Sequence, residues 1–527
     1  MTSSLTPEAF VAALRRSMAL LNEGRAAEAR PEIEQLIAVR PEQPDPYALL
    51  GLAFDQLGDP AQGEAMLRRA IALAPAKPTY PYELARLLAR AGKPDQAADA
   101  YRAHLALAPG NAPARHNLGA VLLDAGQAVA AETELRGALQ GGHDAPETWL
   151  VLGRALEAQG RHDEAEKGYR SALARRPYHF DAHRDLAQLV WRRTQDLAAA
   201  SRALDAALRT SAPSELILQK AKLLEFAGDA AGSFAFLEAR LRPDDAVLLV
   251  AAAQAGLAID PARAMAHAEQ AARLSPNDPA VILTLCQAQL ARGDATAAAA
   301  SATLACELAP ADQQAIALLT TAQRLLGDPA YRRFANYDLV RTYRLDPPVS
   351  WPDLPAFLAD LAAELLARHS LAGHPIGQST RGGGEASLDP RFSREPAIRA
   401  FFEAIREPIA HHIAAIGRAG APFRIAGAWS VRLRPNGFHA NHVHPRGWLS
   451  SAFYVALPAA MEDEASRAGW LKFGEPGPPT RPALPAEHFV KPAPGLLALF
   501  PSCLWHGTVP FGGDEARLSI AFDVVPA

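Results

Sequence analysis

The first 327 residues repeat one pattern of apolar and polar positions at a period of about 34, which is less regular after residue 183. The same point in four successive units is marked by Gly58, Gly92, Gly126 and Gly160. Apolar residues between these glycines recur at helical spacing, so each unit is expected to form two amphipathic helices. One such unit cannot bury its own apolar face, and we therefore expect the units to stack into a superhelix.

The clearest unit covers residues 145–177. Its marker positions are Trp149, Leu152, Gly153, Leu156, Gly160, Ala165, Tyr169, Ala172 and Pro177. The same offsets recur around Gly51 and Gly119. Residues 1–327 as a whole resemble the tetratricopeptide family, with about nine units followed by a closing helix at 314–326. The resemblance implies a concave groove that binds a protein or peptide; a rigid stalk or a dimerisation surface is the alternative.

The helical period ends near residue 327, and prolines, glycines and aromatic residues then become frequent. Apolar spacing predicts helices over residues 331–345, 354–370 and 395–416. These three segments form a helical lead-in to the last part of the chain.

A glycine-rich loop is expected at residues 378–385. Within it, Arg381, Gly382 and Gly383 are candidates for contact with a substrate, since glycines let a backbone approach a ligand closely. A flexible linker is the alternative. The loop lacks the Gly-Lys-Ser/Thr pattern of a phosphate-binding loop, so nucleotide binding is rejected.

From residue 423 the pattern turns to short apolar runs separated by turn residues. The expected strands are 423–425, 428–433, 450–456, 470–473, 496–500, 504–509 and 516–524. Short strands in this number are typical of a double-sheet jelly roll.

The predicted fold class is therefore a multidomain α+β chain. A tetratricopeptide solenoid occupies residues 1–327, and a second domain occupies residues 328–527. The second domain has its helical lead-in over 328–420 and a jelly-roll core, a double-stranded β-helix, over 421–527.

Composition narrows the function classes. With 527 residues the chain is too long for a single core. Its net charge of −4 offers no basic field for nucleic acid or a membrane surface, and no partner of either kind is expected. The three cysteines are scattered, which fits a reducing compartment. We see neither a signal peptide nor a membrane-spanning apolar run, so a cytoplasmic location is expected.

Two closely spaced histidines are candidate metal ligands. His442 and His444 precede the strand predicted at 450–456. Residues two apart on a strand point to the same face, so both imidazoles can reach one metal ion. His506, in the strand predicted at 504–509, supplies a third ligand. Such a site leaves positions open at the metal, as Fe(II) requires when it activates O2.

A 2-oxoglutarate co-substrate would also need a cation for its far carboxylate. Arg517 follows His506 by 11 residues across the turn at 510–513, and a hairpin of that length puts Arg517 beside the metal strand. A guanidinium fork suits a carboxylate. Ser519 points to the same face as Arg517, and Tyr454 faces the barrel interior; both are candidate contacts to 2-oxoglutarate.

Residues 330–526 are similar to the 2-oxoglutarate/Fe(II) oxygenase family that is often fused to tetratricopeptide arrays in bacteria. The matching segments are 375–383, the strand with Trp429, 442–445, 449–454, 469–473, 495–501, His506 and 517–519. The resemblance implies oxidative decarboxylation of 2-oxoglutarate to succinate, coupled to hydroxylation of a substrate. In broader relatives the second residue of the histidine pair is an acid, where this chain has His444.

That departure leaves three interpretations open. In the first, an active oxygenase hydroxylates a protein or peptide bound by the array, and iron is held by all three histidines or by His506 with one of the pair. In the second, the barrel has lost catalysis and the chain is an interaction scaffold. In the third, three histidines form a cupin-type metal enzyme without 2-oxoglutarate. His439 is opposite in phase to His442 and is expected outside the ligand set; Asp523 is expected to be structural.

Overall fold

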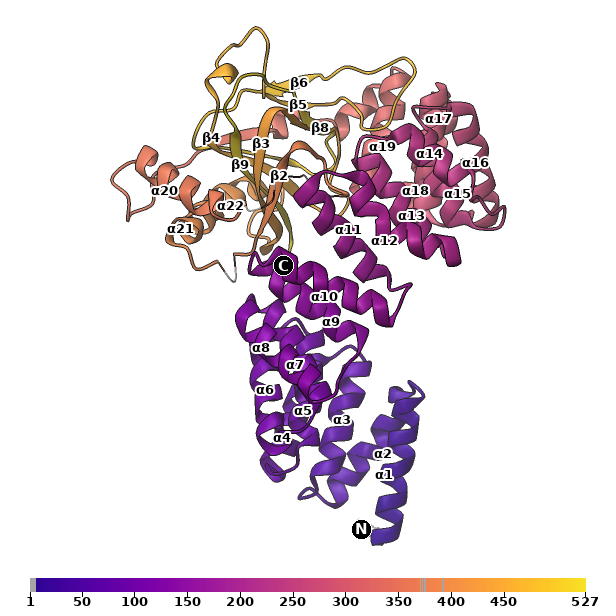
Figure 1. Cartoon of the computed structure of the whole chain (residues 1–527), viewed down its shortest axis with the longest axis vertical. Helices are drawn as coiled ribbons and strands as arrows, with labels where there is room; N and C mark the ends of the chain where they lie inside the picture. The colour runs from indigo at the N-terminus through magenta and orange to yellow at the C-terminus, as the bar shows by residue number, and fades with distance from the viewer. Residues whose placement is uncertain (1–5, 370, 372, 374–375, 391–392) are drawn as a thin grey trace. The chain divides into compact units, whose positions relative to one another are not determined.

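The computed structural model describes residues 6–369, 371, 373, 376–390 and 393–527 (Figure 1). It divides into two compact units, one ending at Ala182 and the other beginning at His183. The fold class is the expected one, a helical tetratricopeptide solenoid followed by antiparallel sheets with flanking helices. The division between the units falls inside the helical part, so the last repeats belong to the same unit as the sheets. A domain boundary at residue 327 stays a prediction.

The first unit consists of paired helices. They are α1 (Pro7–Asn22), α2 (Ala26–Val39), α3 (Pro44–Gln56), α4 (Pro60–Leu73), α5 (Thr79–Arg90), α6 (Pro94–Leu107), α7 (Ala112–Asp124), α8 (Ala128–Gln140), α9 (Pro146–Ala158) and α10 (His162–Arg175); α11 (Phe180–Thr194) begins in this unit and continues into the second. The turn glycine of each unit has a left-handed backbone, with φ of +83° at Gly58, a conformation that side chains disfavour. Within a pair the helices touch: a Cβ at Gly153 would lie 2.6 Å from Tyr169 Cε1.

The second unit continues the array. Its helices are α12 (Leu197–Thr210), α13 (Ser214–Phe226), α14 (Ala230–Glu238), α15 (Ala246–Gly256), α16 (Pro261–Leu274), α17 (Pro279–Arg292), α18 (Ala295–Leu308) and α19 (Gln313–Leu325). In the part of the chain described from residue 6 onward, the order of α1 to α18 corresponds to nine successive two-helix units, and α19 is the expected closing helix. None of the helices that the structure describes is both long enough and apolar enough to cross a bilayer.

Two antiparallel sheets follow. Their strands are β1 (Arg341–Arg344), β2 (Thr380–Leu388), β3 (Phe423–His439), β4 (Leu449–Ala456), β5 (Leu471–Phe473), β6 (His488–Val490), β7 (Leu496–Pro501), β8 (His506–Thr508) and β9 (Arg517–Pro526). One sheet has the order β1-β7-β4-β9-β3-β2, and the other has the order β6-β5-β8. The flanking helices are α20 (Leu354–Leu366), α21 (Pro396–Ala404) and α22 (Arg406–Ala415), with a short 3-10 helix, η3, at Ala459–Met461.

The helix predicted over 331–345 is wrong. The structure has two short 3-10 helices there, η1 (Pro329–Arg333) and η2 (Tyr337–Leu339), and then β1. Strand β1 pairs with β7 in the register Arg341 to Leu499. Pairing at the edge of the sheet therefore overrides the apolar spacing that indicated a helix.

The glycine-rich loop predicted at 378–385 is also wrong, because most of it forms β2, which pairs with β3. Its glycines serve that pairing: a Cβ at Gly383 would lie 2.5 Å from the carbonyl oxygen of Arg432. Gly382 has a φ of +65° at the point where the register shifts. These glycines allow a bulge and a close approach of two strands.

Smaller differences concern element boundaries. The helix predicted over 395–416 is the pair α21 and α22, and the two strands predicted over 423–433 are the single β3, which bends at a bulge. The helix predicted over 354–370 ends at Leu366. Its last predicted residue, Ser370, lies outside the described residues, as does Pro375 of the first family segment.

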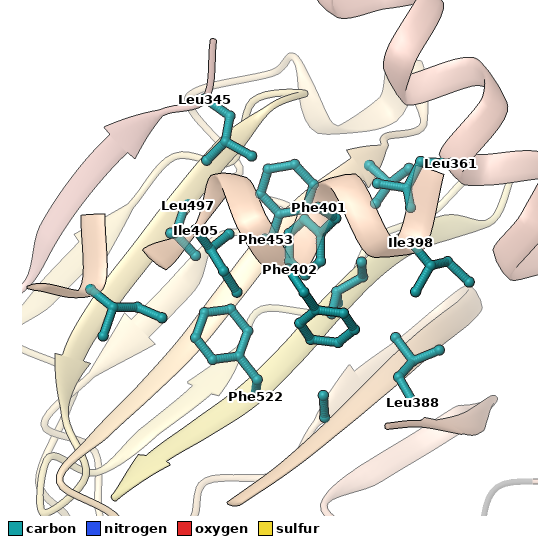
Figure 2. Packing of buried hydrophobic residues seen from close by; sticks show 14 of the residues in the cluster. Leu345, Leu361, Leu388, Ile398, Phe401, Phe402, Ile405, Phe453, Leu497 and Phe522 are labelled. Atoms are coloured by element: carbon teal, nitrogen blue, oxygen red, sulfur yellow. The ribbon is translucent and has the colours of Figure 1, made fainter. Parts of the chain in front are cut away.

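An apolar core joins α20, α21 and α22 to the six-stranded sheet. Figure 2 shows Phe401 and Phe402 of α21 directed at this sheet, near Phe453 of β4 and Phe522 of β9. The ring centroids of Phe401 and Phe453 are 4.8 Å apart, a contact typical of packed aromatic side chains. The helices thus cover one face of the sheet and leave its other face for the cavity described next.

Candidate metal centre

Three histidines meet at one point in the second unit. His506 is the first residue of β8, and its backbone exchanges hydrogen bonds of 2.9 and 3.0 Å with that of His442. His444 lies in the loop before β4, with its Nε2 atom 3.1 Å from His442 Nε2. Candidate ligand atoms of all three residues lie within 4.8 Å of one another. Among the described residues, this is the group of His, Cys, Asp and Glu side chains arranged to hold a metal ion.

The second nitrogen of each ring has its own acceptor. His442 Nδ1 donates to the carbonyl oxygen of Ala440 over 2.8 Å, and His506 Nδ1 donates to that of Leu504 over 2.9 Å. His444 Nδ1 lies 2.7 Å from a carboxylate oxygen of Asp523. These acceptors hold the proton on Nδ1 and leave the Nε2 lone pairs directed at the common point.

Electrostatics keep the imidazoles in the form that binds metals. Burial lowers the pKa of His442 to about 3, and the neighbouring His444 contributes to that lowering. Burial also holds the pKa of His506 well below its ordinary value. Both rings are therefore neutral at physiological pH, and a neutral imidazole is a metal ligand.

The histidine cluster opens onto a cavity of about 580 Å³. Of the residues predicted to bind 2-oxoglutarate or a substrate, Arg517, Ser519 and Arg381 line this cavity. The ring of Tyr454 packs against Arg517, while Gly382 and Gly383 serve the pairing of β2 with β3. The apolar part of the wall includes Val431, Ala452, Leu471 and Phe500.

Arg517 is a buried cation without a counter-charge. Its side chain is 2% exposed, and its Nη1 donates to the carbonyl oxygen of Gly469 over 3.3 Å. No carboxylate among the described residues lies within ion-pair distance of it, and its Nε has no hydrogen-bond partner there. The guanidinium lies 5.0 Å from the centre of the Tyr454 ring, whose buried hydroxyl also lacks a partner in the described chain. An unpaired buried charge is costly, so this arrangement fits an anion.

The path that brings Arg517 to the site differs from the predicted hairpin. Strand β8, which holds His506, belongs to the three-stranded sheet, whereas β9 lies between β4 and β3 in the six-stranded sheet. Arg517 is opposite Leu433, and Ser519 is opposite Tyr454. The turn after His506 therefore carries the chain from one sheet to the other, because the apolar face of β9 completes the core of the larger sheet.

Asp523 is a site residue that the sequence reasoning missed. Its two carboxylate oxygens contact His444 Nδ1 at 2.7 Å and the hydroxyl of Ser450 at 3.0 Å. A signal was present, since Asp523 follows Arg517 by six positions on the same strand, and even spacing puts both side chains on one face.

Two further residues connect the histidines to the end of the array. Trp505 and Val443 pack into an apolar cluster formed by α17, α18 and α19. The indole N–H of Trp505 donates to Thr321 Oγ1 over 2.9 Å, and the backbone N–H of Gln313 donates to the carbonyl oxygen of Pro445 over 3.0 Å. No sequence signal could find these contacts, because they join segments that are distant along the chain.

His439 ends β3 and lines the cavity, but it does not belong to the histidine cluster. Its ring centroid is 6.4 Å from that of His442, and its Nδ1 lies 3.1 Å from the hydroxyl of Ser379. His439 therefore lies outside the histidine cluster, as its position three residues before His442 predicted.

Family models match two parts of the chain. Residues 427–523 match the model described as "Putative 2OG-Fe(II) oxygenase". Tetratricopeptide repeat models match residues 146–189, residues 14–81 and 48–112, and residues 88–155. Both resemblances seen in the sequence are confirmed: the chain carries tetratricopeptide repeats and, at its C-terminal end, a segment that matches this oxygenase model. Such repeats serve protein–protein interaction in general.

Solved structures resemble parts of the chain. A crystal structure of MamA protein is 20% identical, with a TM-score of 0.30, and the match covers 32% of this chain and 93% of that one. PilF from Pseudomonas aeruginosa is 17% identical, with a TM-score of 0.35, over 41% of this chain and 97% of that one. A tetratricopeptide repeat protein from Parabacteroides merdae is 16% identical, with a TM-score of 0.36, and the match covers 52% of this chain and 97% of that one. No curated protein matches the chain.

Proposed function

We propose that the second unit is an Fe(II)- and 2-oxoglutarate-dependent oxygenase that hydroxylates a protein or peptide bound by the repeat array. One observation carries the proposal: three imidazoles converge at a cavity that also holds a buried guanidinium without a counter-charge. The histidine cluster alone would fit many metal enzymes, and the guanidinium alone would fit many anions. Together they match a metal and a dicarboxylate that bind side by side.

The donor set fits Fe(II). His442, His444 and His506 would hold the ion through their Nε2 atoms, since each Nδ1 faces an acceptor. Imidazole suits iron, and three protein ligands leave coordination positions open. Bound Fe(II) would supply the redox chemistry that couples decarboxylation of 2-oxoglutarate to succinate with hydroxylation of the substrate.

The cavity fits 2-oxoglutarate. Arg517 would bind the carboxylate far from the metal, because its free Nε can donate to an anion. The hydroxyl of Tyr454 supplies a further donor, and Ser519 lies two residues after Arg517 on the same face. Binding of the dicarboxylate would thus give partners to Arg517 Nε and to the Tyr454 hydroxyl.

Apolar side chains beside the histidines would keep water from the reacting groups. The Phe500 ring meets the His506 ring edge to face at 4.7 Å, and Leu471 and Ala452 line the same cavity. Excluding water would strengthen the ionic contact between Arg517 and the carboxylate of 2-oxoglutarate, because charges interact more strongly where water is absent. Arg381 of β2 also lines the cavity and would contact a substrate.

The two alternatives make different predictions at Arg517. An inactive scaffold gives no reason to retain a buried cation without a partner. A cupin-type enzyme without 2-oxoglutarate would use the three histidines but would not need an anion at Arg517. The buried guanidinium therefore favours the 2-oxoglutarate-dependent reaction.

The test is an anaerobic titration of the full chain with Fe(II) and 2-oxoglutarate, followed by visible absorption. We expect the weak metal-to-ligand charge-transfer band that forms when 2-oxoglutarate chelates iron. His506→Ala should abolish the band and metal binding, whereas His411→Ala, at an exposed position on α22, should leave both unchanged.

Each other outcome selects an alternative. Iron binding without the band would favour the cupin-type enzyme. Absence of both iron and 2-oxoglutarate binding would favour the scaffold. If the band forms, succinate release with peptides captured by the array then identifies the substrate.

A further inference from the structure

The three imidazoles bring no negative charge to a metal ion. Iron(II) oxygenase sites with a facial triad contain one carboxylate beside two histidines. Beside this cluster lies Asp523, whose carboxylate oxygen is 2.7 Å from His444 Nδ1. The negative charge is therefore present, but it lies on the far side of one imidazole ring.

Asp523 is held firmly in this position. Strands β4 and β9 pair with Ser450 opposite Asp523, and the Ser450 hydroxyl donates to the second carboxylate oxygen over 3.0 Å. Ser450 also contacts the hydroxyl of Ser502 at 3.0 Å. The side chains of His444 and Asp523 are 23% and 16% exposed. A charge-assisted hydrogen bond at such a position is stronger and more directional than one in open solvent.

The three histidines are consequently not equivalent. The Nδ1 atoms of His442 and His506 donate to neutral carbonyl oxygens, whereas that of His444 donates to a carboxylate. A carboxylate behind a ligating histidine fixes its orientation and raises its basicity. His444 should therefore be the strongest electron donor of the three.

We infer that Asp523 is a positioning residue that supplies the negative charge of the metal site through His444. This inference rests on the proposed function, because it requires that the three histidines bind Fe(II). The inference also explains how a histidine can stand at position 444, where a facial triad has its carboxylate. In this chain the carboxylate would contact a metal ligand instead of the metal itself.

The central variant is Asp523→Asn, which keeps the size of the side chain and its ability to accept the His444 Nδ1–H, but removes the charge. Replacement of such outer partners costs roughly 10- to 100-fold in metal affinity. We expect a loss in this range for Co(II), titrated into the full chain and followed by its visible bands. Glu238→Gln is the matched control, since it makes the same change beside His267 of the array, away from the site. It should not change the affinity.

A spectroscopic readout separates positioning from a general structural role. With Fe(II) and 2-oxoglutarate under anaerobic conditions, Asp523→Asn should shift the charge-transfer band to higher energy, because a weaker donor set stabilises the iron electrons. The double variant His444→Asp with Asp523→Asn restores one negative charge at the site. Its band and its Co(II) affinity should return toward those of the wild type, and this recovery would not occur if Asp523 only supported the fold.

The outcomes are distinct. If the wild type binds metal and forms the band, but Asp523→Asn matches it in affinity and band energy, the inference is overturned while the proposed function stands. If Asp523→Asn loses affinity and the double variant does not recover, Asp523 is only structural and the inference is again overturned. If the wild type binds neither Co(II) nor Fe(II), the proposed function and this inference fall together.

Discussion

The indole N–H of Trp505 donates to Thr321 Oγ1 over 2.9 Å, and so joins the residue before His506 to the last helix of the repeat array. The Trp505 nitrogen also lies 3.2 Å from the carbonyl oxygen of Ala317. Val443, between His442 and His444, packs into the same cluster of α17, α18 and α19. The loops that carry the three histidines are therefore fixed against the array, and the two parts of the second unit share one core.

Loosening this contact should weaken metal binding. Trp505→Phe removes the hydrogen-bond donor and leaves part of the pocket unfilled, so we expect Co(II) affinity to fall by roughly tenfold in a titration of the full chain. Thr321→Val should have a smaller effect, because Trp505 retains Ala317 as an acceptor. Thr320→Val is the matched control on the same helix, since its hydroxyl bonds only to the carbonyl oxygen of Ile316. Equal affinities in Trp505→Phe and the wild type would contradict this role.

Removing the guanidinium of Arg517 should weaken the binding of 2-oxoglutarate without lowering the stability of the protein that is free of 2-oxoglutarate. In Arg517→Met, 2-oxoglutarate affinity should fall by roughly 100-fold, because a desolvated carboxylate loses its partner. Without 2-oxoglutarate the variant should be at least as stable as the wild type, since an unpaired buried charge has been replaced by an apolar chain. Thermal unfolding with and without 2-oxoglutarate measures both effects. Arg424→Met, at an exposed position of β3, is the control. A 2-oxoglutarate-induced shift that survives Arg517→Met would exclude the assigned contact.

Acid should destabilise the second unit through His412 of α22. Burial lowers the pKa of this imidazole to about 4. In the unfolded chain this imidazole is protonated below about pH 6.5, whereas in the folded chain it stays neutral down to about pH 4. Its contribution to the free energy of unfolding is therefore fully present above pH 6.5 and is lost as the pH falls toward 4. The contribution of one such group is about 1.4 kcal/mol per pH unit. Urea unfolding between pH 7 and 4.5 should show a shallower pH dependence in His412→Gln than in the wild type. His411→Gln, at the exposed neighbour whose charge adds to this lowering, should change the slope less than His412→Gln does.

Close packing within a repeat should depend on Gly153. A Cβ there would lie 2.6 Å from Tyr169 Cε1, so Gly153→Ala forces the two helices apart. We expect a loss of about 1–3 kcal/mol in the free energy of unfolding. Gly110→Ala is the control, since a Cβ at Gly110 meets nothing within 4 Å. Urea unfolding followed by circular dichroism compares the two, and equal midpoints would show that the helices adjust without cost.

The sequence was most informative where one periodic rule governs a whole element. The array followed from its 34-residue period, and the strand β4 from its apolar run. The prediction failed at β1 and β2, where pairing with a distant strand decides the structure. The glycines of β2 looked like a loop because their role, the approach to Arg432, depends on a partner strand.

The candidate site was predictable to a similar extent. The convergence of His442, His444 and His506 required only spacing and the chemistry of imidazole. The contact between Asp523 and His444 was not predicted, because it depends on the path of the loop before β4, which brings His444 to β9. Trp505 could not be recognised at all, because its partner Thr321 precedes it by 184 residues.

Strand β9 has a consequence for how this segment can change over evolution. Its alternate residues Arg517, Ser519 and Asp523 line the cavity, while Leu518 and Phe522 between them complete the apolar core. Inserting or deleting one residue would exchange the two sets, turning the guanidinium and the carboxylate into the core together. Point substitutions can alter each of these groups separately, but a change of length cannot. Relatives that retain both of these groups at the cavity should therefore vary in composition along β9 and stay constant in its length.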